Sequence, residues 1–217
     1  MTPMSALLAT IHAVGLLTCF ALLGTSRIGA CIRFLSLQGI VFSLVPVITH
    51  DGGLALRVVL LAAANIALKG VIFPAVLLHL RARANFHREV EPFIGFVGSI
   101  LFGIVALAVS LGLARELQPA LSHVPFLMLE AAIFLVAIGL FLIVGRRNAL
   151  MQVIGYLVIE NGIFVFGAIT VVETPLLVEL GILLDAFVAV FVMGIAVFHI
   201  SREFGVADTD RLTTLRG

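Results

Sequence analysis

Seven long apolar runs constrain this chain more than any other feature of its sequence. Each is long enough to cross a bilayer, because a membrane-spanning helix needs about 20 apolar residues. Lipid offers no partners to backbone N–H and C=O groups, so only helices and closed barrels span it. Runs of this length without alternating polarity predict an all-α integral membrane protein with seven transmembrane helices. They lie near residues 4–25, 28–49, 54–80, 92–114, 122–144, 149–171 and 176–200.

The rest of the composition narrows the function. Only 12% of the 217 residues are charged, about half the share of an average soluble domain. This scarcity excludes a water-soluble enzyme, a nucleic-acid-binding domain and a disordered chain, and it makes the lipid bilayer the first predicted partner. Cys19 and Cys31 lie in apolar runs and are too few for an iron–sulfur cluster, which usually needs four thiolates. We therefore expect no metal or cofactor in this chain.

The basic residues predict the orientation. In a seven-span arrangement, ten arginines fall on one side of the membrane and only Arg57 and Arg115 on the other. The positive side faces the cytoplasm, so the N-terminus is predicted outside and residues 201–217 in the cytoplasm. The ten are Arg27, Arg33, Arg81, Arg83, Arg88, Arg146, Arg147, Arg202, Arg211 and Arg216.

Four ionisable residues lie deep inside the runs: Lys69, Glu130, Glu160 and Asp185. An ionised group at the centre of a membrane helix costs ~2.5–3.5 kcal/mol unless it pairs or meets water. At 1.5 Å per residue, each lies ~12–16 Å from one end of its run, which predicts one polar layer near the midplane. Such a layer is typical of a proton path. The alternative is a static pair of the lysine with a carboxylate that fastens helices together.

Polar neighbours extend this candidate site toward both membrane surfaces. Amides beside the ionisable residues could orient or hydrate them, or bond between helices. Charges near span ends could form the mouths of a path, or serve only as interfacial charges and positive-inside anchors. These residues are the polar helpers Asn65 and Asn161, Glu179 at the outer mouth, and Arg146 and Arg147 at the cytoplasmic mouth.

The stretch RRNALMQVIGYLVIEN, Arg146 to Asn161, resembles the three-helix K subunit of respiratory complex I and its antiporter relatives. The shared marks are an arginine pair leading into a helix, an Ile-Gly step and the final asparagine. The glutamate of that family would fall on Leu157, whereas this run carries Glu160, three residues on and on the same helix face. The next family glutamate corresponds best to Asp185. The resemblance implies that Glu160 and Asp185 serve a similar pathway.

A wider set of residues covers 69–217. It comprises Lys69 with Pro74, Arg147-Asn148, Gly155-Tyr156, Glu160-Asn161-Gly162, the segments 177–182 and 185–193, and the tail from Asp210 to Gly217. This set resembles component E of hydrogenase-4 and formate hydrogenlyase-type complexes. That resemblance implies a four-helix membrane region at 1–115, a K-like three-helix module at 116–200 and a cytoplasmic tail at 201–217.

The same resemblance implies the function. The chain would be a non-catalytic membrane-arm subunit of a complex I-like group 4 NiFe hydrogenase in a prokaryotic cytoplasmic membrane. The NiFe centre and iron–sulfur clusters would lie in partner subunits. Its neighbours would be antiporter-like subunits and the membrane anchor of the peripheral arm, and its midplane residues would carry protons or Na⁺. Two alternatives stay open: a subunit of a multisubunit cation/proton antiporter, and a purely structural membrane adaptor.

The charge asymmetry gives a test of topology. An epitope tag fused after Gly217 should be reached by a membrane-impermeant label only from the cytoplasmic side, because ten of the twelve arginines lie there in the predicted arrangement. Labelling only from the periplasmic side would overturn the predicted orientation.

Overall fold

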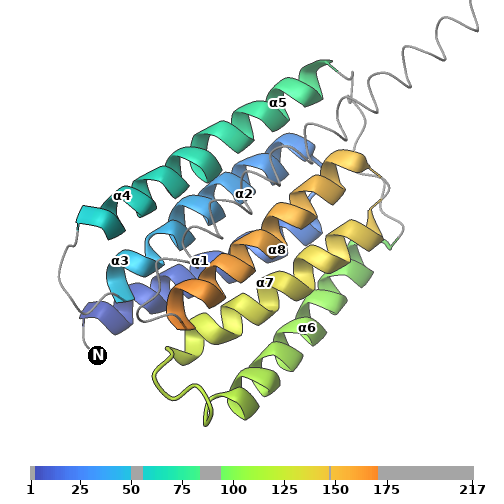
Figure 1. Cartoon of the computed structure of the whole chain (residues 1–217). Coiled ribbons are helices and arrows are strands. Elements are labelled where there is room, and N and C mark those ends of the chain that lie inside the picture. The colour runs from blue at the N-terminus through green and yellow to red at the C-terminus, as the bar shows by residue number, and fades with distance from the viewer. Residues whose placement is uncertain (1–2, 50–55, 84–93, 147, 171–217) are drawn as a thin grey trace, which may run out of the picture.

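The computed structural model describes residues 3–49, 56–83, 94–146 and 148–170, and this part of the chain is all-helical (Figure 1). Six segments are long and apolar enough to cross a membrane, and they match the first six predicted spans. The seventh, at 176–200, lies outside the described residues. The six are Pro3–Gly24, Ile28–Thr49, Val58–Ala82, Phe96–Leu117, Phe126–Gly145 and Leu150–Thr170.

The first two spans pack against each other. They are α1 (Pro3–Gly24) and α2 (Ile28–Ser43), and α3 (Val45–Thr49) completes the second span. The break between α2 and α3 precedes Pro46, which has no N–H and cannot bond to a carbonyl four residues back. A glycine keeps α1 and α2 close, since a Cβ on Gly15 would lie 2.5 Å from the Phe42 ring.

The third span contains an irregular turn. It consists of α4 (Leu56–Asn65), the π-helical segment η1 (Ile66–Ile72) and α5 (Phe73–Arg83). Pro74 lacks the N–H that would bond to the Gly70 carbonyl in an α-helix. The Ser36 hydroxyl on α2 donates to that carbonyl instead, at 2.8 Å. Neighbouring side chains often satisfy such freed backbone groups in membrane helices, and π-helical turns occur frequently at functional sites.

The last three described helices form a contiguous unit of α6 (Phe96–Leu117), α7 (Phe126–Gly145) and α8 (Ala149–Thr170). A short connection joins α7 to α8, and the side chain of Asn148 caps α8 by accepting the Leu150 N–H at 2.9 Å. Two glycines allow the backbones of α7 and α8 to touch: a Cβ on Gly155 would lie 2.8 Å from the Gly139 carbonyl oxygen.

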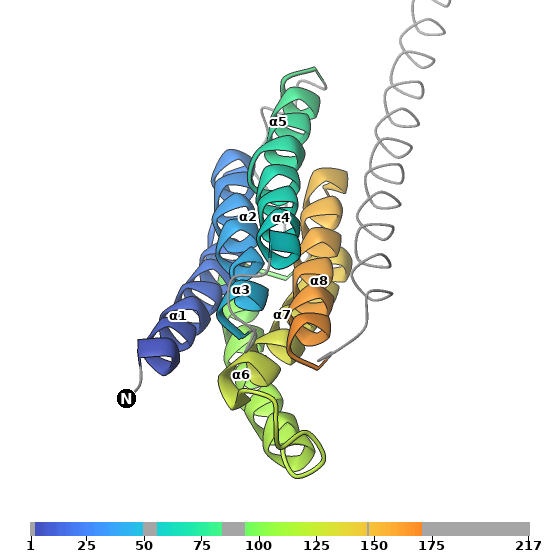
Figure 2. The ribbon, with the colours of Figure 1, turned by 60° about the vertical axis from the view of Figure 1, so that its left-hand side comes forward.

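The helices lie side by side in one bundle (Figures 1 and 2). The span built from α4, η1 and α5 lies at one edge and α6 at the opposite edge, with α1, α2, α7 and α8 between them (Figure 1). α1 contacts α6 and α7, whereas α2 contacts η1 and α8. The first two helices therefore join the third span to the C-terminal helices, and polar residues from all of these elements can meet inside the bundle.

The α7–α8 crossing gives a test of packing. Gly155→Ala should lower the free energy of unfolding by about 1–3 kcal/mol, as overpacking does, because the new methyl group meets backbone atoms that cannot turn away. Reversible denaturation of the full chain in mixed micelles, followed by circular dichroism, measures this. The matched control is Gly112→Ala on α6, where an added Cβ meets nothing within 4 Å. Equal stability of both variants would contradict the close crossing.

Candidate functional site

A buried ion pair joins the third span to α8. Lys69 Nζ lies 2.6 Å from Glu160 Oε1, and each side chain is only 4% exposed. A Cβ on Gly39 would lie 2.7 Å from the Lys69 Cβ, so this glycine of α2 allows η1 to pack against it. The sequence predicted both residues as buried charges, and the structure brings them together.

The surroundings of the pair stabilise the lysine more fully than the carboxylate. The Lys69 ammonium lies 4.4 Å from the centroid of the Phe164 ring, within the range of a cation–π contact. Phe164 is one turn beyond Glu160 on α8, so both partners of the lysine share one helix face. The second carboxylate oxygen of Glu160 has no hydrogen-bond partner among the described residues. It is the open acceptor of the pair.

An amide bridge begins next to this pair. The Asn161 side chain donates to Gln38 Oε1 at 3.2 Å. The Gln38 amide donates to the Thr18 hydroxyl at 3.1 Å and to the Cys19 sulfur at 3.4 Å. Gln38 is fully buried on α2, so it links α8 to α1 across the interior. The sequence analysis did not select it, although a glutamine inside an apolar run was the available signal.

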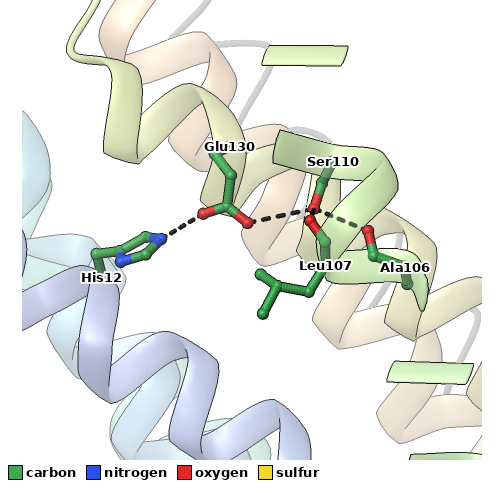
Figure 3. A network of polar contacts seen from close by, with 5 residues as sticks. All are labelled: His12, Ala106, Leu107, Ser110 and Glu130. Atoms are coloured by element: carbon green, nitrogen blue, oxygen red, sulfur yellow. Dashed lines mark hydrogen bonds and ion pairs between the residues drawn. The ribbon is translucent and has the colours of Figure 1, made fainter. Parts of the chain in front are cut away.

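A second polar cluster lies between α1, α6 and α7 (Figure 3). The Glu130 carboxylate on α7 is fully buried, and it contacts His12 Nε2 on α1 through Oε2. Its other oxygen, Oε1, accepts a hydrogen bond from the Ser110 hydroxyl on α6 at 3.2 Å. Glu130 was predicted from the sequence as a candidate, but His12 and Ser110 were not, because a histidine near a helix end and a serine in a helix are both ordinary features.

The two clusters lie at different depths along their helices. α7 begins at Phe126, four residues later than predicted, because Pro125 precedes the first turn and fits that position. Glu130 is then ~6 Å from this helix end at 1.5 Å per residue. Glu160 is ~15 Å from the end of α8 at Thr170. The described carboxylates therefore occupy two levels, where the sequence analysis expected a single layer.

Arg146 follows α7 directly and is completely buried. Its Nη2 donates to the Leu23 carbonyl near the end of α1 at 2.8 Å, and its guanidinium lies 5.5 Å from the Phe96 ring centroid. Burial lowers the pKa of this guanidinium from its ordinary value, and the nearby Cys31 acts in the opposite direction. Arginine nevertheless stays protonated in proteins, so Arg146 is a fixed positive charge held against α1.

The remaining predicted residues divide into two groups. Asn65 is buried, and its amide donates to the Leu61 carbonyl of its own helix at 3.2 Å; no hydrogen bond between the side chains of Asn65 and Lys69 is found among the described residues. Asn161 donates to Gln38 although it adjoins Glu160. The other predicted residues, Arg147, Glu179 and Asp185, lie outside the described part of the chain.

Comparison with known proteins identifies the family. Residues 127–217 match the family described as NADH-ubiquinone/plastoquinone oxidoreductase chain 4L. An uncharacterised protein of Mycobacterium tuberculosis is 32% identical over 193 residues, which are 86% of each chain. Hydrogenase-4 component E of Escherichia coli (strain K12) is 37% identical over 118 residues, and so is that of Shigella flexneri. The chain belongs to the same family as the mycobacterial protein, and over about half of its length it is a homologue of hydrogenase-4 component E.

The extent of these matches differs along the chain. The alignment with component E covers 54% of this chain and 51% of the relative, so the chain spans about half the length of that protein. The mycobacterial protein is matched over most of both chains. No solved structure matches the chain. The chain is thus a multi-pass membrane protein related to hydrogenase-4 component E and to complex I chain 4L, as its sequence resemblances predicted.

The ion pair gives a double-mutant test. Lys69→Met should lower the free energy of unfolding by roughly 3–5 kcal/mol, because it leaves the Glu160 carboxylate buried without its cation. Adding Glu160→Gln removes that charge, so the double variant should be more stable than Lys69→Met alone. Denaturation in mixed micelles measures both. As a control, Arg33→Met on the exposed face of α2 should change stability by less than about 0.5 kcal/mol. Strictly additive effects would contradict the pairing.

Proposed function

We propose that this chain is a membrane-arm subunit of a complex I-like group 4 NiFe hydrogenase and contributes ionisable residues to its proton-translocation path. The observation that carries the proposal is the Lys69–Glu160 pair inside the bundle. Ionisable residues at this depth are rare and mark proton or ion pathways. The similarity to hydrogenase-4 component E over about half of the chain and the chain 4L match support the assignment to such an assembly.

The pair has the chemistry of a proton-transfer step. A proton that moves from Lys69 Nζ to Glu160 Oε1 across their 2.6 Å contact leaves a neutral amine and a neutral carboxylic acid. Both states of the pair carry no net charge, so neither has the cost of an isolated ion in lipid. A proton from a neighbouring donor could then reach the amine. If the neutral carboxyl group turns, its O–H takes the position of the unpartnered oxygen, from which the proton can be released to the next acceptor.

The remaining members of the path are assigned by position and resemblance. Asp185 would continue the midplane path from Glu160, and Glu179 would form its outer mouth. Arg146 and Arg147 would set the electrostatic potential at the cytoplasmic mouth, since fixed cations favour ionised carboxylates nearby. Antiporter-like subunits and the membrane anchor of the peripheral arm would provide the continuation of the path. The NiFe centre and iron–sulfur clusters would belong to the partner subunits.

A structural adaptor is the second candidate function. The observation in its favour is that Lys69 and Glu160 neutralise each other's charge and join two helices, as a purely structural pair would. In that case the charges matter for assembly and not for transport. The two functions differ in their response to a neutral isostere, which removes titration but keeps shape.

The test uses the assembled complex, purified from the native membrane through a tag on this chain and reconstituted in liposomes. Glu160→Gln and Asp185→Asn should each assemble normally and retain redox activity, while redox-linked proton uptake into the liposomes falls several-fold. The control is Glu116→Gln, an exposed carboxylate at the end of α6, which should leave proton uptake unchanged.

Two outcomes would contradict the proton-path proposal. The first is normal assembly of Glu160→Gln and of Asp185→Asn with proton uptake intact. The second is failed assembly of Glu160→Gln together with rescue by the charge-reversed pair Lys69→Glu with Glu160→Lys. That rescue would support the structural adaptor, because a reversed pair restores attraction without restoring the order of groups along a path.

A further inference from the structure

We propose that His12, Ser110 and Glu130 form a second proton-binding site, which exchanges one proton with water from the predicted outer side of the membrane. The three residues come from α1, α6 and α7 and meet around one buried carboxylate (Figure 3). His12 and Ser110 have no role in the proton-transfer step at Lys69 and Glu160. As part of a proton path, this site rests on the proposed function; as a proton-binding site, it can be tested in the chain alone.

Ser110 can serve Glu130 in both protonation states. Its hydroxyl has one proton but lies within hydrogen-bond distance of three acceptors: Glu130 Oε1 at 3.2 Å and the carbonyls of Ala106 at 2.9 Å and Leu107 at 3.0 Å. When Glu130 is ionised, the hydroxyl donates to its carboxylate. When Glu130 is protonated, the acid can donate to Ser110, and the hydroxyl turns to a backbone carbonyl. Neither state leaves a buried polar group unpaired, which would be costly.

His12 complements this arrangement on the other carboxylate oxygen. An imidazole with a proton on Nε2 donates to the ionised Glu130, and a second proton on Nδ1 makes it the cation that balances the carboxylate. The proton gained thus has two places to reside, Glu130 or His12, and the bonds on both oxygens are kept in each case. The His12 side chain is 14% exposed whereas Glu130 is fully buried. The histidine is therefore the member through which a proton enters.

Few other titratable groups act on this site from the elements packed around it. On α1, the Cys19 thiol lies within electrostatic range of Glu130. Arg115 and Glu116 are on α6, but both are exposed and lie more than one turn beyond Ser110. On α7, Glu130 is itself the only charged residue of the helix. Within the described residues, the exchangeable proton is thus governed chiefly by His12.

The His12–Ser110–Glu130 cluster differs from the Lys69–Glu160 pair in ways that support a separate role for it. Within the part of the chain that the structure describes, the second oxygen of Glu160 has no hydrogen-bond partner, whereas both oxygens of Glu130 have one. Both side chains of that pair are only 4% exposed, whereas the His12 side chain is 14% exposed. The His12–Glu130 cluster is therefore the one suited to binding a proton directly from water.

Infrared difference spectroscopy of the full-length chain in lipid nanodiscs tests this proposal. On acidification of the medium, the wild-type chain should gain a carboxylic-acid C=O band that Glu130→Gln abolishes. His12→Gln should change the pH dependence of this band, because the carboxylate loses its only nearby cation among the described residues. Ser110→Ala should move the band to higher frequency, because the protonated acid loses its hydrogen-bond acceptor. His123→Gln, which alters an exposed loop histidine, is the control and should leave the band unchanged.

Two results would overturn the site: a wild-type spectrum identical to that of Glu130→Gln, or a Glu130 band whose pH dependence is the same with and without His12. If Glu130→Gln does not fold, Glu130→Asp replaces it and should shift the band without removing it; an unshifted band would likewise overturn the assignment. Failure of the proposed function is distinguishable, because it would be seen as intact redox-linked proton uptake in assembled complexes that carry Glu160→Gln or Asp185→Asn, whereas this band is measured in the chain alone.

Discussion

The need to pair buried charges governs the way this bundle packs. Lys69 lies in the third span and Glu160 in α8, more than ninety residues apart in sequence, and each would be costly alone in lipid. Their pairing brings η1 and α8 together beside α2, which contacts both. Gly39 on α2 allows that approach, and Ser36 on the same helix satisfies the carbonyl that Pro74 leaves free. The π-helical turn of the third span and the small and polar residues of α2 beside it therefore allow this one ion pair to form.

The Gln38 bridge links α8 to α1 between the Lys69–Glu160 pair and the His12–Glu130 cluster, but it does not offer a proton route between them. Each of its groups is used: the carbonyl accepts from Asn161, and the amide donates to Thr18 and Cys19. Thr18 in turn donates to backbone carbonyls of α1. All bonds in this series point the same way and end at a backbone carbonyl, which does not release a proton. The bridge thus connects helices α1, α2 and α8 and does not itself provide a route for protons.

The sequence predicted the functional candidates whose burial in lipid has a high free-energy cost. It did not predict the polar residues that are common in membrane helices. Charged residues in apolar runs are rare, so Lys69, Glu130 and Glu160 could be selected without a structure. The sequence could not show which carboxylate pairs with Lys69, nor select His12 and Ser110 as the partners of Glu130, because the helices are apolar on all sides and no face predicts its neighbour. A serine such as Ser110 usually bonds to its own helix, and it does so here as well as reaching Glu130. The six spans were predictable from length and hydropathy alone, although their ends depended on Pro125 and similar local features.

Glu130 and Glu160 differ more in the basic group that each one contacts than in how deeply each is buried. Both are nearly inaccessible, but one faces an ammonium and the other an imidazole. Both side chains of the ammonium pair are only 4% exposed, so water does not reach its proton directly. The imidazole belongs to a side chain that is 14% exposed, and Ser110 can form a hydrogen bond with Glu130 in either protonation state. A path with a histidine at its more exposed end and a lysine deep inside would accept protons at one level and respond to them electrostatically at the other.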